Sequence, residues 1–292
     1  MSSGVLLLAH GTPDSLDEMP EYLTRVRGGR PPSPELVDEM RRNYAAIGGR
    51  SPLTDLTRAQ ARALGSRLGA TPVYVGMRNW RPLIADALQG AAAAGVDDLV
   101  ALPMAPQYSS VSVGKYRTAV EAATPAGMRV RFVDSWHDHP GLLDAFAEKV
   151  RAALGAGTGP AVIFTAHSLP VSVVEAGDPY PEQVRVTAAG VAERLGLASL
   201  DVAWQSAGRT PEPWLAPSLE QRLGQLADAG QRRVLVAPIG FVCDHTEILY
   251  DIDVQAQAVA RARGVALRRS ESLNSSPAFV AALADIVRRA RG

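Results

Sequence analysis

The chain has 292 residues, 47% of them hydrophobic, and a formal net charge of zero at pH 7. The balanced charge argues against nucleic acid as a bulk partner. No apolar run approaches the ~20 residues that span a bilayer, and no basic cleavable leader opens the chain, so we expect a cytoplasmic protein without membrane insertion. The single cysteine, Cys243, excludes an intramolecular disulfide and an all-cysteine metal or iron–sulfur site within one chain.

Strand-like runs alternate with amphipathic helical patterns along the whole chain. The expected strands cover 4–9, 72–77, 98–103, 129–133, 161–165, 201–205 and 233–238. The expected helices cover 34–46, 54–68, 81–94, 113–123, 141–154, 181–194, 217–229, 245–262 and 277–290. Strands that are separated by helices of this length predict an α/β fold with mostly parallel sheets.

Two pairs of segments suggest that the chain is an internal duplication. Val5–Pro13 and Val162–Pro170 are both apolar runs that end in Ala-His, with a Pro three positions after the His. Leu99–Pro103 and Val234–Pro238 are each followed by a polar loop and then a helical pattern. We therefore expect two similar Rossmann-like domains, each a parallel sheet flanked by helices, with the active-site cleft between them.

The boundaries of these domains follow from a glycine-rich stretch at Gly155–Gly159, which we interpret as a linker. The N-terminal domain would cover 1–156, and the C-terminal domain, with the chemistry-bearing residues, would cover 157–276. The last helix, within 277–292, would pack back on the N-terminal domain.

His167 and an acidic segment carry the strongest chemical signal. A lone histidine at a strand end most often bonds a backbone carbonyl, but Asp244–Glu247 ends the later strand at the same sheet edge. An imidazole and a carboxylate that converge there could bind a divalent metal or relay protons. Glu247 and Asp251 share a helix face at i, i+4. Carboxylates at a helix start also cap amides, and we expect capping to account for Asp244.

A group of arginines between 25 and 50 suggests a site for carboxylates. Arg27 and Arg30 lie in a Gly/Pro loop, where a guanidinium can hold a carboxylate through two hydrogen bonds. The alternative is a solvated helix face, which we favour for Arg41 and Arg42. The loop therefore predicts the rim of a site for a ligand with several carboxylates.

The ordered motifs of this chain resemble those of the ferrochelatases. They are His10–Pro13, Thr165–Pro170, Gly177–Pro181, Trp204–Gly208, Pro213–Pro217 and Pro238–Asp251, and the likeness covers essentially the whole chain. The loops Arg27–Pro32 and Tyr44–Gly49 are most similar to the coproporphyrin III ferrochelatase type of these class II chelatases. The chain also lacks the hydrophobic membrane-binding lip and the cysteine-bearing extension found elsewhere in the family.

The resemblance implies insertion of Fe²⁺ into coproporphyrin III in haem biosynthesis, with iron as substrate and no prosthetic group. It implies that His167 and Glu247 are the catalytic and metal-binding pair and that Asp251 lies on a route for protons or metal. Metallation releases two pyrrole protons, and an imidazole of near-neutral pKa is suited to accept them. The family positions that contact the porphyrin correspond to Arg27, Asn43, Tyr44, Ser51 and Tyr116.

Two positions depart from the family pattern. The coproporphyrin enzymes have a tyrosine where this chain has His10, which could ligate the product iron on the face opposite His167. Alternatively, His10 is a packed strand-end residue without iron contact. Gln255 stands where an acid often lies, which puts an auxiliary metal site along that helix in doubt.

Other functions remain open at this point. They are a protoporphyrin IX ferrochelatase, a cobalt or nickel chelatase acting on sirohydrochlorin, and a non-catalytic haem or porphyrin carrier. A carrier would need an axial histidine but not the acidic line from Glu247 to Asp251, so that line favours an enzyme. We expect a monomer that binds porphyrin and Fe²⁺, with a downstream haem-pathway enzyme as a candidate acceptor of the product.

Overall fold

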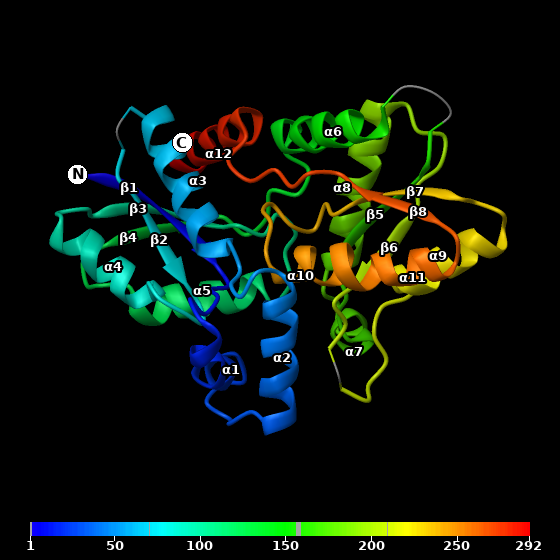
Figure 1. The fold of residues 1–292 in the computed structure, drawn as a ribbon. Helices are drawn as coiled ribbons and strands as arrows, with labels where there is room; N and C mark the ends of the chain where they lie inside the picture. Colours follow the sequence, from blue (N-terminus) through cyan, green and yellow to red (C-terminus); the bar gives the residue numbers. More distant parts are fainter. Residues whose placement is uncertain (1, 70, 156–158, 209) are drawn as a thin grey trace.

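The computed structural model describes residues 2–69, 71–155, 159–208 and 210–292. It contains two sheets, each with four parallel strands (Figure 1). The first has the order β2-β1-β3-β4 and is built from β1 (Ser3–Ala9), β2 (Val73–Met77), β3 (Asp98–Pro103) and β4 (Arg129–Phe132). The second has the order β6-β5-β7-β8 and is built from β5 (Ala161–His167), β6 (Val202–Gln205), β7 (Arg233–Ala237) and β8 (Ala266–Arg269). The two sheets thus share one strand order, which confirms the predicted α/β fold with two similar halves.

Helices cover both sheets (Figure 1). The first half contains α1 (Met19–Val26), α2 (Pro34–Ala46), α3 (Leu53–Arg67), α4 (Ile84–Ala93), α5 (Val113–Ala123) and α6 (Pro140–Leu154), with a 3₁₀ turn at Leu16–Glu18. The second half contains α7 (Val171–Glu175), α8 (Tyr180–Leu195), α9 (Leu219–Asp228), α10 (Thr246–Leu249), the π-helix η2 (Asp251–Ala256) and α11 (Gln257–Ala262), and α12 (Pro277–Arg291) follows at the end of the chain. No helix in the described part of the chain is both long and apolar enough to cross a membrane.

The elements follow the predicted strands and helices, with several additions. The sequence did not predict α1, α7, the 3₁₀ turn at Leu16–Glu18 or the edge strand β8. The expected helix over 245–262 is confirmed in extent, but its middle is the π-helix η2, which lies between α10 and α11. The expected linker at 155–159 includes residues 156–158, which lie outside the described residues.

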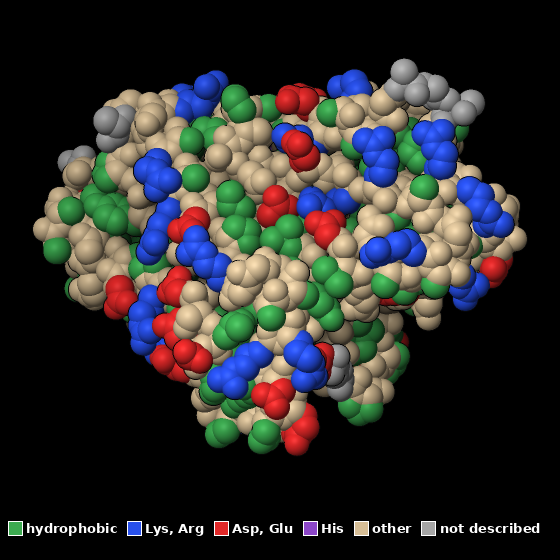
Figure 2. Space-filling view, in the orientation of Figure 1, with side chains coloured by type: hydrophobic (Ala, Val, Ile, Leu, Met, Phe, Trp, Pro, Cys, Tyr) green, Lys and Arg blue, Asp and Glu red, His purple; other side chains and the backbone are tan. Residues whose placement is uncertain are grey.

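The strands β1 and β5 are buried because helices cover their sheets on both faces. Val5, Leu6, Leu7 and Leu8 have no exposed surface, as expected for the central strand of a covered parallel sheet. One buried cluster contains side chains from both halves, so the apolar core continues from one sheet to the other. Figure 2 shows acidic and basic side chains interspersed over one face of the molecule.

The last helix and the two chain ends lie on the first half. Helix α12 packs against α3 and α6, and its Phe279 stacks on Trp136 with ring centroids 6.1 Å apart. At the N-terminus, Ser2 O accepts a hydrogen bond from the Asp97 amide at 3.0 Å. At the C-terminus, Arg131 Nη1 donates to Arg291 O at 2.6 Å. Both ends are therefore fixed near the amino-terminal edge of the first sheet (Figure 1).

Candidate functional site

A cleft of about 420 Å³ lies at the carboxyl ends of the strands of both sheets. Its walls come from the residues that follow β1 and β3 in the first half and β5 and β7 in the second. Apolar and aromatic side chains dominate the lining, and His10, His167, His245 and Glu247 supply titratable groups. The two predicted strand-end histidines therefore line the same cleft.

His167 ends β5, and its ring orientation follows from a backbone contact. Nδ1 lies within hydrogen-bond distance of Ser168 O, and a carbonyl only accepts, so Nδ1 carries the proton. The lone pair of the neutral ring is then on Nε2, which lies 3.8 Å from Glu247 Oε2. His167 therefore presents a proton acceptor to the cleft beside a carboxylate.

Glu247 lies in the first turn of α10, between two imidazoles. His245 Nε2 lies 3.7 Å from Glu247 Oε2, and His245 Nδ1 donates to Cys243 O at 3.0 Å. Burial alone would raise the pKa of Glu247, but the charges of His167, His245 and His10 and a hydrogen bond to His245 lower it to about 2. The carboxylate is thus ionised at neutral pH.

His245 is a residue to which the sequence assigned no role. Burial lowers its pKa, but the hydrogen bond and charge of Glu247 outweigh burial and raise the pKa above its ordinary value. Across the described ranges, no three His, Cys, Asp or Glu side chains are gathered closely enough to enclose a metal ion. His167 and His245 nevertheless direct nitrogen atoms toward the same carboxylate oxygen.

His10 lies on the wall formed by the first half. Asn79 Nδ2 is 3.1 Å from its Nε2, and the Tyr22 ring meets it edge-on at 6.3 Å between centroids. Burial, followed by the charge of Arg78, lowers the pKa of His10 to about 4. The ring is therefore neutral at physiological pH, and its Nε2 lone pair accepts a hydrogen bond from the Asn79 side-chain amide.

The structure brings together three of the five residues expected to contact a porphyrin. Tyr44, Ser51 and Tyr116 line the cleft, and Tyr44 Oη lies 2.9 Å from Thr12 Oγ1. Arg27 is exposed, Asn43 is half-buried, and neither is among the lining residues. Their assignment stays a prediction.

Arg78 is a cleft residue that the sequence reasoning missed. It follows β2 directly and lies 5.3 Å from the centroid of the Tyr116 ring. Its Nη1 is buried and has no hydrogen-bond partner among the described residues. The rule that identified His10 and His167, a polar residue just after a buried strand, would also have indicated Arg78.

The π-helix η2 gives Asp251 a different position from the one that a regular α-helix predicts. Tyr250 O accepts from the amides of Val254 and Gln255 at 3.0 and 2.9 Å, so the 3.6-residue spacing does not extend across this junction. Asp251 accepts a hydrogen bond from Ser206 Oγ and is not among the residues that line the cleft. Burial raises its pKa to about 6.

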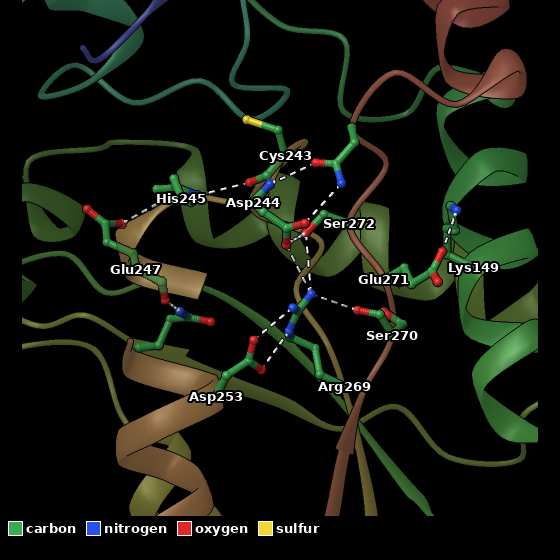
Figure 3. A network of polar contacts seen from close by, with 12 residues as sticks. Lys149, Cys243, Asp244, His245, Glu247, Asp253, Arg269, Ser270, Glu271 and Ser272 are labelled. Atoms are coloured by element: carbon green, nitrogen blue, oxygen red, sulfur yellow. Dashed lines mark hydrogen bonds and ion pairs between the residues drawn. The ribbon is translucent and has the colours of Figure 1, made fainter. Parts of the chain in front are cut away.

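Asp244 does not cap α10, in contrast to the expectation from sequence. The N-cap residue is His245, and no side chain makes a capping hydrogen bond there. Asp244 instead accepts hydrogen bonds from Ser272, Asn274 and Arg269 (Figure 3). Both oxygens of Asp244 accept hydrogen bonds from these donors, and neither accepts one from the amides of α10.

Comparisons with known proteins show the family to which this chain is related. The sequence model of the ferrochelatase family matches residues 2–291. A ferrochelatase of Deinococcus radiodurans is 42% identical over 302 residues, covering 98% of this chain and 95% of that protein. A coproporphyrin III ferrochelatase of Geobacillus thermodenitrificans is 40% identical over 298 residues, covering 97% and 94%.

A solved structure is similar in fold. SirB from Bacillus subtilis, determined with Fe³⁺, has a TM-score of 0.59 and 12% sequence identity, and the match covers 99% of this chain and 96% of that one. This likeness supports the two-sheet architecture.

Proposed function

The chain belongs to the ferrochelatase family, whose members insert Fe²⁺ into a porphyrin in haem biosynthesis, and on this premise we propose that its substrate is coproporphyrin III. The observation that supports the reaction most directly is the pair of opposed walls, with His10 on one side and His167 beside Glu247 on the other. A flat macrocycle between them would have its nitrogen atoms beside a base. The product would be iron coproporphyrin III.

The polar groups of the second wall account for the release of two pyrrole protons. His167 Nε2 accepts a proton, and the Glu247 carboxylate stabilises the imidazolium because it stays ionised. His245 provides a second imidazole on the same carboxylate oxygen. Asp251, with a pKa of about 6, then exchanges protons near neutral pH on the outward route.

The first wall supplies groups for the carboxylates of the substrate. Arg78 has a buried guanidinium nitrogen without a hydrogen-bond partner among the described residues, and a propionate would provide one. The hydroxyl groups of Tyr44, Ser51 and Tyr116 offer further hydrogen bonds, and we propose Arg27 and Asn43 as contacts at the rim. Coproporphyrin III carries four propionates and protoporphyrin IX carries two, so the former uses more of these groups.

A side-by-side measurement of insertion tests the substrate. With Fe²⁺ under anaerobic conditions, kcat/KM for coproporphyrin III should exceed that for protoporphyrin IX by about tenfold or more, because each unpaired polar group costs transition-state binding. A preference for protoporphyrin IX would overturn the coproporphyrin assignment. Faster insertion of cobalt or nickel into sirohydrochlorin would overturn the iron assignment, and tight porphyrin binding without turnover would indicate a carrier.

A further inference from the structure

The segment that carries His245 and Glu247 consists of a loop and the start of an irregular helical run. After β7 the loop leads into α10, and the π-helix η2 then joins α10 to α11. A π-helical turn inside a helix is rare, and the loop before it has no regular hydrogen bonding of its own. The position of Glu247 in the cleft must therefore come from contacts with the rest of the protein.

Arg269, the last residue of β8, makes the most extensive of these contacts (Figure 3). Its Nε and Nη2 donate to the two oxygens of Asp253 in η2, both at 2.8 Å. Its Nη1 donates to Asp244 Oδ1 at 3.2 Å and to Ser270 O at 3.1 Å. One guanidinium, with only 15% of its side chain exposed, thus joins residues on both sides of Glu247.

Asp244 is in turn held from the segment that leads into α12. Ser272 Oγ donates to Oδ1 at 2.7 Å, and Asn274 Nδ2 donates to Oδ2 at 2.9 Å. The Asp244 amide donates back to Asn274 Oδ1 at 2.9 Å. Gln60 of α3, in the first half, donates to Asn274 O at 2.8 Å. The network therefore connects the segment around Glu247 to the opposite half of the molecule.

We infer that Arg269 is a positioning residue for metallation: by bridging Asp244 and Asp253, it fixes where His245 and Glu247 face the cleft. The inference rests on the proposed role of Glu247. Asp244 directly precedes His245, and Asp253 lies six residues after Glu247, so the bridge closes a short loop around both groups. The shape of the guanidinium matters, because only its planar fork bonds both Asp253 oxygens and Asp244 together.

Breaking an ion network of this kind changes both stability and local geometry. Removing ions from water is costly, and their attraction offsets that cost only when the hydrogen bonds are complete. Loss of Arg269 would leave Asp244 and Asp253 as two unneutralised carboxylates near the ionised Glu247. We expect the segment to shift until water reaches those carboxylates, which moves Glu247 away from its place.

A matched pair of variants separates positioning from stability. Arg269→Met removes the bridge, and Arg269→Lys retains the charge without the fork. Arg222→Met is the control, because Arg222 makes an equivalent pair with Asp201 at 2.8 to 2.9 Å just before β6, at the sheet edge away from the cleft. For each variant, the thermal midpoint, the Kd for metal-free coproporphyrin III by fluorescence quenching, and kcat and KM for Fe²⁺ are measured.

Arg269→Met should lower kcat/KM for Fe²⁺ by about ten- to a hundredfold, because a small displacement of a reacting group lowers the rate by about this factor. The porphyrin Kd should stay within about twofold of wild type. Arg269→Lys should recover part of the loss. Arg222→Met should lower the thermal midpoint but leave kcat/KM within about twofold. Equal activity losses in Arg269→Met and Arg222→Met, or a parallel loss of porphyrin binding, would overturn the inference.

Two further variants complete the test. If Arg269→Met does not fold, Asp253→Asn replaces it in the test, because asparagine keeps the shape of the side chain and weakens the bond to Arg269. Wild-type activity of Asp253→Asn would contradict the inference. Glu247→Gln tests the proposed function separately. If Glu247→Gln stays fully active, the proposed role of Glu247 fails, whereas an inactive Glu247→Gln with unaffected Arg269 variants overturns only the positioning role.

Discussion

His167 and His10 follow equivalent central strands, yet their surroundings give them different proton chemistry. His167 Nε2 lies 3.8 Å from a carboxylate oxygen of Glu247, which is ionised at neutral pH. His10 is beside Asn79 and Arg78, and burial together with the arginine charge lowers its pKa to about 4. One wall of the cleft therefore places an imidazole beside an ionised carboxylate, and the other holds a neutral imidazole.

Replacing His167 tests the proton-accepting wall. His167→Ala should bind porphyrin with nearly unchanged affinity but insert Fe²⁺ about 10²- to 10⁴-fold more slowly, the usual contribution of a positioned base. Single-turnover absorbance changes of the porphyrin measure the insertion step, and fluorescence quenching measures binding. An insertion rate within about threefold of wild type would remove His167 from the mechanism.

Replacing His10 tests whether this residue binds the iron of the product. Because a neutral imidazole binds ferric iron strongly, His10→Ala should alter the absorption and electron paramagnetic resonance spectra of the bound ferric product. Asn79→Ala is a useful companion, since it removes the contact at 3.1 Å and leaves the imidazole in place. Identical spectra for His10→Ala and wild type would show that His10 is a packing residue only.

At the scale of elements, the β7–α10 loop must approach β5 very closely to place Glu247 beside His167. The Gly240 amide donates to Thr165 O at 3.1 Å. A methyl group at Gly240 would lie 2.6 Å from Ala166 Cβ and 2.7 Å from Ala166 Cα, closer than real contacts. The glycine is therefore required by the packing of the loop against the strand that ends in His167.

Gly240→Ala should push this loop away from β5 and reduce insertion by about tenfold or more, because the two reacting groups separate. Gly90→Ala in α4 is the control, since nothing lies within 4 Å of its added methyl group. That change should stabilise the protein by about 0.5–1 kcal/mol through its helix preference. Comparable activity of the two variants in the same insertion assay would show that the close approach has no catalytic consequence.

The π-helix supplies a prediction about pH. Burial raises the pKa of Asp251 from 3.8 to about 6, so the folded state binds a proton that the unfolded state releases earlier. Stability from this group is present at low pH and is lost as the pH rises through about 6. The thermal midpoint of wild type relative to Asp251→Asn should therefore fall between about pH 4 and pH 6 and stay level above about pH 7. A difference that is independent of pH would contradict the raised pKa.

The sequence predicts those parts of the fold and site that depend on strands. Apolar runs such as Val5–Leu8 are fully buried, and polar residues that follow parallel strands meet at one edge, which is why His167 and Glu247 could be paired in advance. The sequence did not predict the edge strand β8, because Leu267 is the only buried residue of this strand. A single buried side chain gives no periodic signal.

The site details that the sequence did not predict depend on tertiary contacts. Asp244 has a residue type typical of a cap, but its partner Asn274 lies 30 positions away. The π-helix has the same apolar spacing as an ordinary helix, so periodicity predicts a continuous helix there. The hydrogen bond from Ser206, which directly follows β6, to Asp251 is a long-range contact that this periodicity does not reveal.

At the scale of the whole molecule, the shared core predicts that both halves unfold together. Phe279 of α12 is fully buried and stacks on Trp136. Phe279→Ala should lower the free energy of unfolding by about 3–5 kcal/mol, and Val186→Ala, at an exposed site, by less than about 0.5 kcal/mol. Urea unfolding should give coincident transitions by fluorescence and circular dichroism for each protein. Two separate transitions would show that the halves are independent units.

The fixed positions of the two chain ends have a practical consequence. Ser2 and Arg291 are both held at the amino-terminal edge of the first sheet, whereas the cleft opens at the carboxyl ends of the strands. A tag, a surface tether or a fused partner attached at either end would project from the side of the molecule away from the cleft. A short linker that joins the two ends would likewise give a circular chain whose porphyrin access is unobstructed.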